Sequence, residues 1–428
     1  MPEILRKRVL HVLFSWLVLG TIASPLEPEE IGSSPQIQAV FLNPPPRECP
    51  VLQDGSTTNT FPWTHPPTCL SLIRPSSPGS HTGKAHTYCV YTNTAFNNGR
   101  GISIVTSPET AAELSYEVWE SGVGGRGHSK SEEQWEVKET EGKGFGLFAK
   151  RDIDPGETLI LQTPVLLVSR EVLDSVSHSR RRTLLEKAVT QLPPTTRELV
   201  MSLSRRGGDS VIEDIINVNA HRAKVWDGTF HLLLNPEAAR INHACRPNTY
   251  YRFNDHTLLF DLFALRPISP GEEMTYSYGF STEPHATRQE RLKGTWGFTC
   301  TCSLCTSPTS TLALSDTNLL TISSIKSSLP TSLDDIPQYI TILPKLISLL
   351  DEEGLLAEMP LYEEILAYAW SAVRDKEKAR AWAERARWHW GVVAGKESWE
   401  ARRMGELAEN VEGHFTWGMW EGEWASLG

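Results

Sequence analysis

The middle of the chain alternates short apolar runs with polar turn residues. Residues 154–157, Asp-Pro-Gly-Glu, form one turn signal, and Pro270-Gly271 forms another. Short strands separated by Pro-Gly turns predict a compact, mostly β core. The strand-like runs are 141–149, 158–168, 250–253, 258–263 and 274–278.

Two other stretches carry a helical pattern. Residues 171–216 look mostly helical, with a break at Pro193-Pro194. Near the C-terminus, apolar residues recur at helical spacing on two successive helices, which resembles paired TPR-like hairpins, although no repeat of about 34 residues is visible. Eight of the fourteen tryptophans lie between residues 370 and 424, and we expect them to pack in the core. The two faces are Leu366, Trp370 and Val373, then Ala379, Trp382, Ala383, Ala386 and Trp390.

The N-terminal part differs in composition from the rest. Residues 1–23 resemble a signal peptide, with a basic start and an apolar run, and a short membrane anchor or a mis-assigned start codon would give the same pattern. Residues 24–130 form a Pro/Ser/Thr-rich region with three cysteines, which ends in a glycine-rich linker at 122–127. We therefore expect a domain boundary near residue 130. Beyond the N-terminal segment, no stretch is long enough to span a bilayer.

Charge narrows the choice of partner. The 428 residues carry a net charge of −11, of which −8 falls in residues 311–428, with nineteen acidic and eleven basic side chains. An acidic chain lacks the electrostatic pattern of a phosphate-backbone binder, so we predict no direct nucleic-acid binding. A basic protein substrate would suit this charge better, and we expect a monomer.

The seven cysteines fall into two sets. Cys49, Cys69 and Cys89 are spaced by twenty residues, so two of them could pair in an oxidising compartment and leave one odd thiol. The second set is Cys300, Cys302 and Cys305, one ligand short of a tetrahedral zinc site, and the nearest cysteine upstream is Cys245. We therefore predict that the Cys245 segment folds against the Cys-x-Cys-x-x-Cys segment and that the four thiols hold one structural zinc.

Four motifs stand in the order found in SET-domain lysine methyltransferases. They are Gly144-Phe145-Gly146, the run Asn242-His243-Ala244-Cys245-Arg246-Pro247-Asn248, the run 271–278 that ends in Tyr276-Ser277-Tyr278, and Cys300-x-Cys302-x-x-Cys305. Residues 287–298 look most similar to the SMYD-type branch and its fungal relatives. The 171–240 insert contains no cysteine, so the MYND zinc module of that branch is absent from it.

The resemblance implies an α+β fold with a mostly β SET core. It divides the chain into a SET domain at 131–282 with a helical insert at about 171–235, a zinc-bound post-SET segment at 283–308, and a C-terminal all-α, TPR-like region at 309–428.

The resemblance also implies that S-adenosylmethionine is the methyl donor. The backbone of Gly144, Phe145 and Gly146 would cradle it, and Asn242 and His243 would fix its amino and carboxylate ends. Two further roles have open alternatives. Lys143 reaches the cofactor's carboxylate or is a solvated turn residue, and Phe298 packs on the adenine or belongs to the core.

Tyr278 is the predicted catalytic residue, with Tyr276 beside it on the same strand face. A tyrosine hydroxyl aimed at the lysine amine can orient its lone pair toward the methyl group. The alternative for Tyr278 is a buried strand tyrosine. Tyr250, Tyr251 and Phe280 are weaker candidates for the lysine channel, and we expect Glu272 and Glu273 to shape a turn or strand surface.

The expected activity is therefore methyl transfer from S-adenosylmethionine to a lysine of a histone or another protein. The alternative is a catalytically inactive SET-like module for protein interaction. The compartment stays open, because residues 1–23 suggest secretory entry while the resemblance suggests nucleus or cytoplasm.

Overall fold

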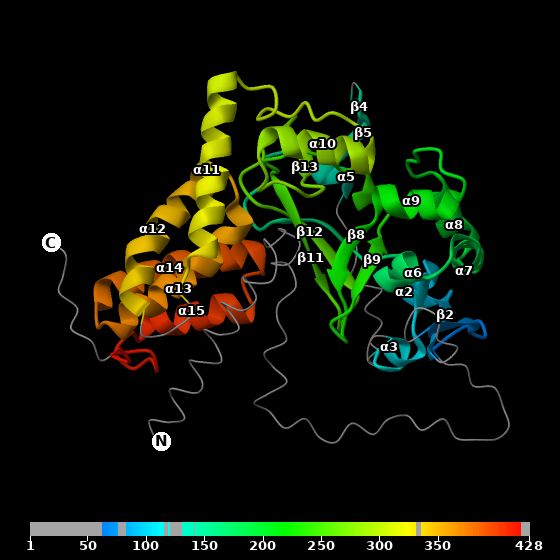
Figure 1. The fold of residues 1–428 in the computed structure, drawn as a ribbon, viewed down its shortest axis with the longest axis horizontal. Coiled ribbons are helices and arrows are strands. Elements are labelled where there is room, and N and C mark those ends of the chain that lie inside the picture. The colour runs from blue at the N-terminus through cyan, green and yellow to red at the C-terminus, as the bar shows by residue number, and fades with distance from the viewer. Residues whose placement is uncertain are drawn as a thin grey trace.

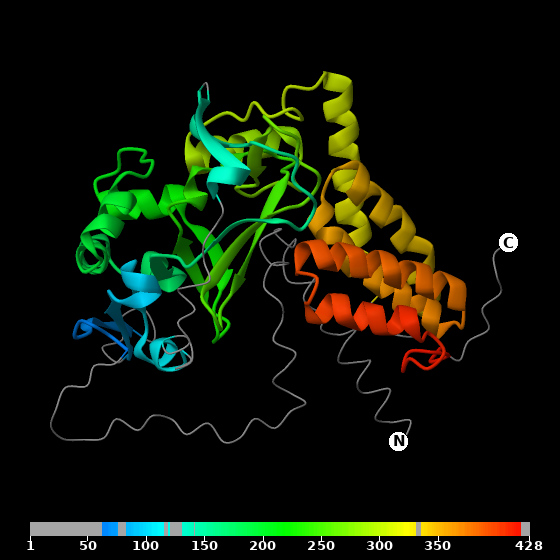
Figure 2. The ribbon, with the colours of Figure 1, turned by 180° about the vertical axis from the view of Figure 1, so that it is seen from behind.

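The computed structural model describes residues 62–75, 83–114, 119, 131–140, 142–330 and 335–420. The signal-like segment 1–23, Cys49 and the glycine-rich segment 122–127 lie outside these residues. A β-rich part lies between two groups of helices, with the C-terminal helices on one side and the 171–216 helices on the other (Figure 1). The view from behind shows the same order (Figure 2). Among the described residues, no helix has both the length and the apolar character needed to cross a membrane.

The strands form three sheets, whose orders are β1-β2-β3-β7-β9-β8, β10-β13-β5-β4 and β11-β12-β6. The strand runs expected from the alternation pattern correspond to strands with two differences: the run 158–168 is divided into β6 and β7, which lie in different sheets, and the last strand ends at Tyr276, so Tyr278 follows it. The strands are β1 (Thr68–Pro75), β2 (Gly83–Asn93), β3 (Ile102–Thr106), β4 (Trp135–Thr140), β5 (Gly144–Ala149), β6 (Thr158–Gln162), β7 (Leu166–Ser169), β8 (His221–Lys224), β9 (Phe230–Leu234), β10 (Asn242–His243), β11 (Thr249–Asn254), β12 (Leu259–Ala264) and β13 (Glu273–Tyr276).

The largest sheet crosses the boundary expected near residue 130. Strand β3 pairs in parallel with β7, with Ser103 opposite Leu166, and β7 continues the sheet to β9 and β8. Residues 68–106 are therefore part of the same folded unit as the central strands, which corrects the expectation of a separate N-terminal region. The physical reason is burial: all five residues of β3 are buried, because Ile102 and Ile104 on one face and Val105 on the other pack into two hydrophobic clusters.

Helices between β7 and β8 confirm the helical pattern of residues 171–216. Pro194 occupies the first turn of α8, where the missing N–H has no partner to lose, so the Pro-Pro pair ends one helix and begins the next. Helix α7 lies against β2 and β3. The helices are α6 (Arg170–Ser175), α7 (His178–Thr190), α8 (Pro194–Met201) and α9 (Val211–Asn219); elsewhere in the β-rich part lie α2 (Phe96–Gly99), α3 (Pro108–Ala112), α5 (Ser131–Gln134), η4 (Ala238–Arg240) and α10 (His285–Trp296).

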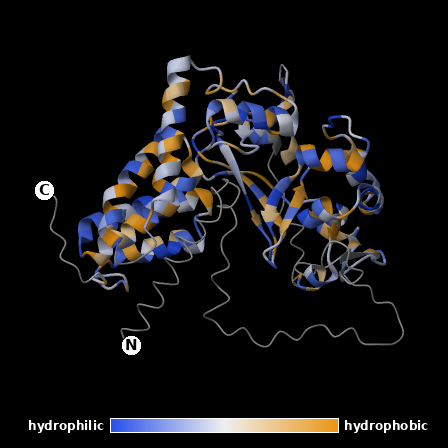
Figure 3. Ribbon diagram, in the orientation of Figure 1, coloured by the Kyte–Doolittle hydropathy of each residue, from blue (hydrophilic) through white to orange (hydrophobic). Residues whose placement is uncertain are grey.

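The C-terminal region is helical throughout its described part, and its TPR-like character stays a prediction. Hydrophobic residues recur along these helices and along the central strands (Figure 3). Ala379, Ala383, Ala386 and Trp390 are buried, as their spacing predicts. Trp388 and Trp399 are instead 56% and 46% exposed, so core packing does not account for every tryptophan. The helices are α11 (Thr309–Ser327), α12 (Ile336–Glu352), η6 (Leu356–Glu358), α13 (Met359–Ala372), α14 (Lys376–Val393) and α15 (Trp399–Glu409).

Candidate active site

Strand β13 brings three of the sequence motifs together. It pairs in parallel with β10, which places His243 opposite Tyr276, and it pairs on its other side with β5, which begins at Gly144. The glycine motif, the Asn-His motif and the Tyr-x-Tyr motif therefore meet on neighbouring strands, although about a hundred residues separate the first two in the sequence.

The glycine motif sits against a polar cradle. A Cβ atom at Gly146 would lie 2.8 Å from both Glu273 Oε1 and Thr140 Oγ1, and 3.0 Å from Asn242 Nδ2, so only glycine fits. The Thr140 hydroxyl is buried and has no hydrogen-bond partner in the part of the chain that the structure describes, which is the kind of orphaned group that a ligand can satisfy. Phe145 is 57% exposed, so its backbone rather than its ring faces the cradle.

Glu273 connects the members of this cradle. Asn242 Nδ2 donates to Glu273 Oε1 at 2.7 Å and to the Phe145 carbonyl at 3.3 Å. Lys143 Nζ lies 3.1 Å from Glu273 Oε2. The expectation that Glu273 only shapes a strand surface is thus incomplete, because its carboxylate lies between two predicted cofactor residues. Its neighbour Glu272 does hold the turn, since it accepts from Arg266 and Asn248.

His243 lies between Tyr278 and the thiols. Its Nδ1 accepts a hydrogen bond from the Tyr278 backbone N–H at 3.0 Å. The proton of the neutral ring is therefore assigned to Nε2, which lies 3.4 Å from Cys245 Sγ and can donate to it. Burial lowers the pKa of His243 to about 4, so the ring is neutral near pH 7.

Aromatic rings surround Tyr278. Its hydroxyl donates to the Ile241 carbonyl at 2.9 Å. Its ring centroid is 4.9 Å from that of Tyr276, 5.5 Å from Trp296 and 6.1 Å from Phe298. Burial and then the charge of Glu273 raise the pKa of Tyr278 above its usual value, so the hydroxyl keeps its proton and remains a donor.

The weaker channel candidates separate into two groups. Phe280 lies 5.8 Å from Trp296, so it adjoins the rings around Tyr278. Tyr251 is 6.4 Å from Tyr276, while Tyr250 is buried with Phe263 against the C-terminal helices. Tyr250 also stacks on Tyr251 at 5.7 Å between centroids, so it is connected to Tyr276 through Tyr251.

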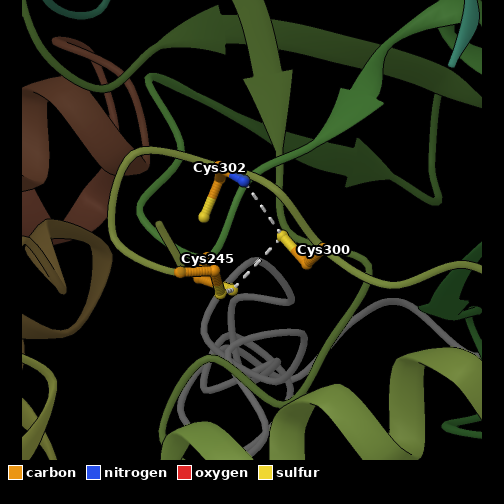
Figure 4. A group of neighbouring side chains, drawn as sticks. Cys245, Cys300 and Cys302 are labelled. Carbon is orange, nitrogen blue, oxygen red and sulfur yellow. Dashed lines mark hydrogen bonds between the residues drawn. The ribbon is translucent and has the colours of Figure 1, made fainter. Parts of the chain in front are cut away.

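The four thiols of the second cysteine set meet, as predicted. Their Sγ atoms all lie within 4.8 Å of one another, with Cys245 3.9 Å from Cys300 and 3.5 Å from Cys305. In Figure 4 the sulfur atoms of Cys245, Cys300 and Cys302 point toward a common centre. A tetrahedral zinc with Zn–S bonds of about 2.3 Å needs S···S separations of roughly 3.8 Å, so the donor set and its spacing fit zinc.

A buried cation accompanies these thiols. Arg288, on α10, is fully buried, and its charge interacts with Cys245 and Cys305. Hydrogen bonds among the four thiols lower the pKa of Cys302 and Cys305 and raise the pKa of Cys245, and the pKa of Cys300 is raised as well, so the metal-free thiols share their protons.

Sequence reasoning did not single out Glu273, Trp296, Arg288 or His221 as site residues. Trp296 and Arg288 stand within the run 287–298 that carried the resemblance, so their positions were visible although their contacts were not. His221 lies in no motif, and its ring meets that of Tyr276 only through packing between two different sheets.

Comparison with known proteins gives partial matches centred on this region. Residues 144–279 match the SET domain family. A SET and MYND domain-containing protein of Dictyostelium discoideum is 42% identical over 15% of this chain and 19% of its own length. The histone-lysine N-methyltransferase set5 of Schizosaccharomyces pombe is 26% identical over 38% of this chain and 47% of its own. The N-lysine methyltransferase SMYD2 of Sus scrofa is 28% identical over 41% of this chain and 40% of its own.

The chain thus spans less than half the length of these curated relatives. The matched family covers the strands that join the glycine cradle, Asn242, His243 and Tyr278. Residues 144–279 of this chain are a SET domain.

Proposed function

We propose that this chain is a protein-lysine N-methyltransferase that uses S-adenosylmethionine and one structural zinc. The observation that carries the proposal is the meeting of the Gly146 cradle, the Asn242-His243 pair and the Tyr278 ring cluster on neighbouring strands. The names of the relatives, a histone-lysine and an N-lysine methyltransferase, support a lysine of a histone or another protein as the substrate.

The cofactor would lie in the polar cradle. When bound, S-adenosylmethionine supplies a methyl group on a sulfonium that is open to attack by an amine. Gly144, whose Cβ position has no atom within 4 Å, leaves room for its backbone-facing side, and Lys143 would balance its carboxylate. Asn242 has an amide that can serve its amino and carboxylate ends, and Phe298 would pack on its adenine.

Tyr278 and Tyr276 would line the lysine channel. The unperturbed pKa of lysine is about 10.4, and the amine must lose its proton before it can attack. A channel of aromatic rings excludes water and penalises the charged ammonium, which favours the neutral amine. The Tyr278 hydroxyl, held in its protonated form, would orient that amine toward the methyl group.

Zinc would hold the post-SET segment, residues 283–308, against the SET core through Cys245, Cys300, Cys302 and Cys305. A closed shell of four thiolates leaves no ligand position for substrate, so the metal would be structural. The zinc would lie next to the active site, because its ligand Cys245 stands two residues after His243.

The test is methyl transfer to core histones and to total cell protein with radiolabelled S-adenosylmethionine, by the full-length, zinc-loaded chain. We expect Tyr278→Phe to lose about 10²-fold or more of the rate, since it removes the orienting hydroxyl and keeps the ring. Tyr339→Phe is the control, because it removes a buried hydroxyl that bonds the Pro330 carbonyl in the helical region. It should retain the wild-type rate.

The alternative, a catalytically inactive module for protein interaction, makes a different prediction. Wild-type protein that binds S-adenosylmethionine in calorimetry and labels neither histones nor cell protein would favour the inactive module. Equal rates for wild type and Tyr278→Phe would instead remove Tyr278 from the mechanism.

A further inference from the structure

The side chain of Asn242 has one polar group left for a ligand. Its Nδ2 carries two hydrogens and donates twice, to Glu273 Oε1 at 2.7 Å and to the Phe145 carbonyl at 3.3 Å. An ionised carboxylate and a carbonyl can only accept, so these two partners fix the orientation of the amide. The Asn242 Oδ1 accepts no hydrogen bond from the residues that the structure describes. Asn242 therefore offers the cradle an acceptor and no donor.

The neighbouring His243 has no such group to offer. Its Nδ1 accepts from the Tyr278 backbone N–H at 3.0 Å, and its Nε2 faces Cys245 Sγ at 3.4 Å. Both ring nitrogens are therefore engaged inside the protein. Of the Asn-His pair, Asn242 is the residue whose side chain can hydrogen-bond a ligand.

Glu273 uses its second oxygen to hold a cation. Lys143 Nζ lies 3.1 Å from Glu273 Oε2, and the two side chains are 30% and 18% exposed. Gly146 permits this arrangement, because a Cβ at its position would lie 2.8 Å from Glu273 Oε1 and 3.0 Å from Asn242 Nδ2. One carboxylate thus holds two groups of opposite polarity, the amide that presents an acceptor and the cation of Lys143.

The amino-acid end of S-adenosylmethionine carries the complementary pair, an ammonium that donates hydrogen bonds and a carboxylate that accepts them. We propose, on the basis of the proposed function, that Glu273 is a positioning residue that determines which way round this end binds. The ammonium would face Asn242 Oδ1, and the carboxylate would face Lys143. This assignment narrows the role of Asn242, because an amide that could turn over would serve either end.

The reversed orientation would be unfavourable at both contacts. The ammonium would meet the cation of Lys143, and the carboxylate would meet the oxygen of Asn242, so neither contact could form a hydrogen bond. Glu273→Gln removes the restraint, because a neutral amide donates as well as accepts. The Asn242 amide could then turn over and present either of its groups, and Lys143 would lose its charged partner.

The test measures binding of three ligands to the full-length, zinc-loaded chain by calorimetry. They are S-adenosylhomocysteine, which is the cofactor after loss of its methyl group, and its analogues without the α-amino group or without the carboxyl group. In the wild type, loss of the amino group should weaken binding by about tenfold or more, as expected for a hydrogen bond to a charged group. In Glu273→Gln this cost should fall to about threefold or less, the range of a weak neutral bond. The cost of losing the carboxyl group should not fall.

Glu272→Gln is the matched control. Glu272 is the adjacent glutamate and accepts from Arg266 and Asn248 in the turn, so its variant should keep the wild-type cost for each group. A double variant tests whether Glu273 acts through Asn242. In Asn242→Ala the amide is absent, so the addition of Glu273→Gln should cause no further fall in the cost of losing the amino group.

Three results would overturn the inference and leave the proposed function standing. Unchanged costs in Glu273→Gln would remove Glu273 from the binding of this end. Equal falls in both costs would show a general loosening of the cradle and no control of orientation. A further fall in the double variant would show that Glu273 contacts the amino group itself. If the wild-type chain bound no S-adenosylhomocysteine, the proposed function would fail, and the inference with it.

Discussion

At the scale of single residues, the site depends on groups whose charge is hidden from solvent. Arg288 is among the largest fully buried side chains of the described chain, and Glu273 lies between Asn242 and Lys143. A zinc ion with four thiolates carries a net charge of −2, and the buried guanidinium of Arg288 would offset part of it. Groups behind the ligands tune a metal site in this way nearly as strongly as the ligands do.

We therefore predict that Arg288→Gln weakens zinc binding by about 10- to 100-fold. The measurement is competition for zinc with a coloured chelator of known affinity. Arg291→Gln is the matched control, because Arg291 lies on the same helix with a side chain 46% exposed, where it pairs with Glu283. Equal losses in the two variants would contradict a specific role for Arg288.

At the scale of elements, the sequence predicted where strands and helices lie along the chain, but it did not predict which strands pair with one another. The apolar runs and the Pro-Gly turns located β6 and β13, because alternation and turn residues act locally, but the single run 158–168 is divided between β6 and β7 of two different sheets. The pairing of β3 with β7 joins residues more than sixty positions apart, and no local pattern encodes it. For the same reason the four-thiol cluster was predictable from ligand number, whereas the stacking of His221 on Tyr276 was not.

The first cysteine set illustrates this limit. Three cysteines allow three possible pairs, and the structure joins Cys69 to Cys89, which lie opposite each other on β1 and β2. The bond fastens the edge strand of the largest sheet. An oxidised pair of this kind is typical of an oxidising compartment, while the zinc thiols must stay reduced, so metal loading would have to protect them.

We predict that Cys69→Ala/Cys89→Ala lowers the free energy of unfolding by about 2–4 kcal/mol, because the open chain gains conformational freedom in the unfolded state. Denaturant titration of the full chain measures this loss. Each single substitution should cost about as much as the double one, since either removes the whole bond. Additive single losses would show that the two side chains act separately.

At the scale of the whole molecule, the helical region is fastened to the SET domain next to the zinc site. Arg246 follows Cys245 and donates to the Cys245 and Ser281 carbonyls at 2.8 and 3.0 Å, and also to Glu353. Glu353 is buried and accepts further bonds from Ser315 and Asn318. The acidic excess of residues 311–428 led us to expect a basic protein substrate, yet part of this acidic charge is buried in ion pairs within the protein.

Under the proposed function, this contact would couple the helical region to the cofactor site. The Cys245 and Ser281 carbonyls lie on either side of Tyr278 in sequence. If Arg246 lost its fixed position, the backbone segments at Cys245 and at Ser281 would both lose a hydrogen bond. We predict that Glu353→Gln weakens S-adenosylmethionine binding by about tenfold, a change of about 1.4 kcal/mol that calorimetry on the zinc-loaded chain would measure. It should also lower the Tm, because Arg246 loses the partner of its buried charge.

Glu358→Gln separates the two effects. Glu358 is equally buried and pairs with Lys326, so both members of this ion pair belong to the helical region. Its loss should lower the Tm through the same uncompensated charge and leave cofactor affinity at the wild-type value. If both variants weakened the cofactor equally, affinity would follow the overall stability of the helices. If only Glu353→Gln did so, the helical region would act on the site through Arg246.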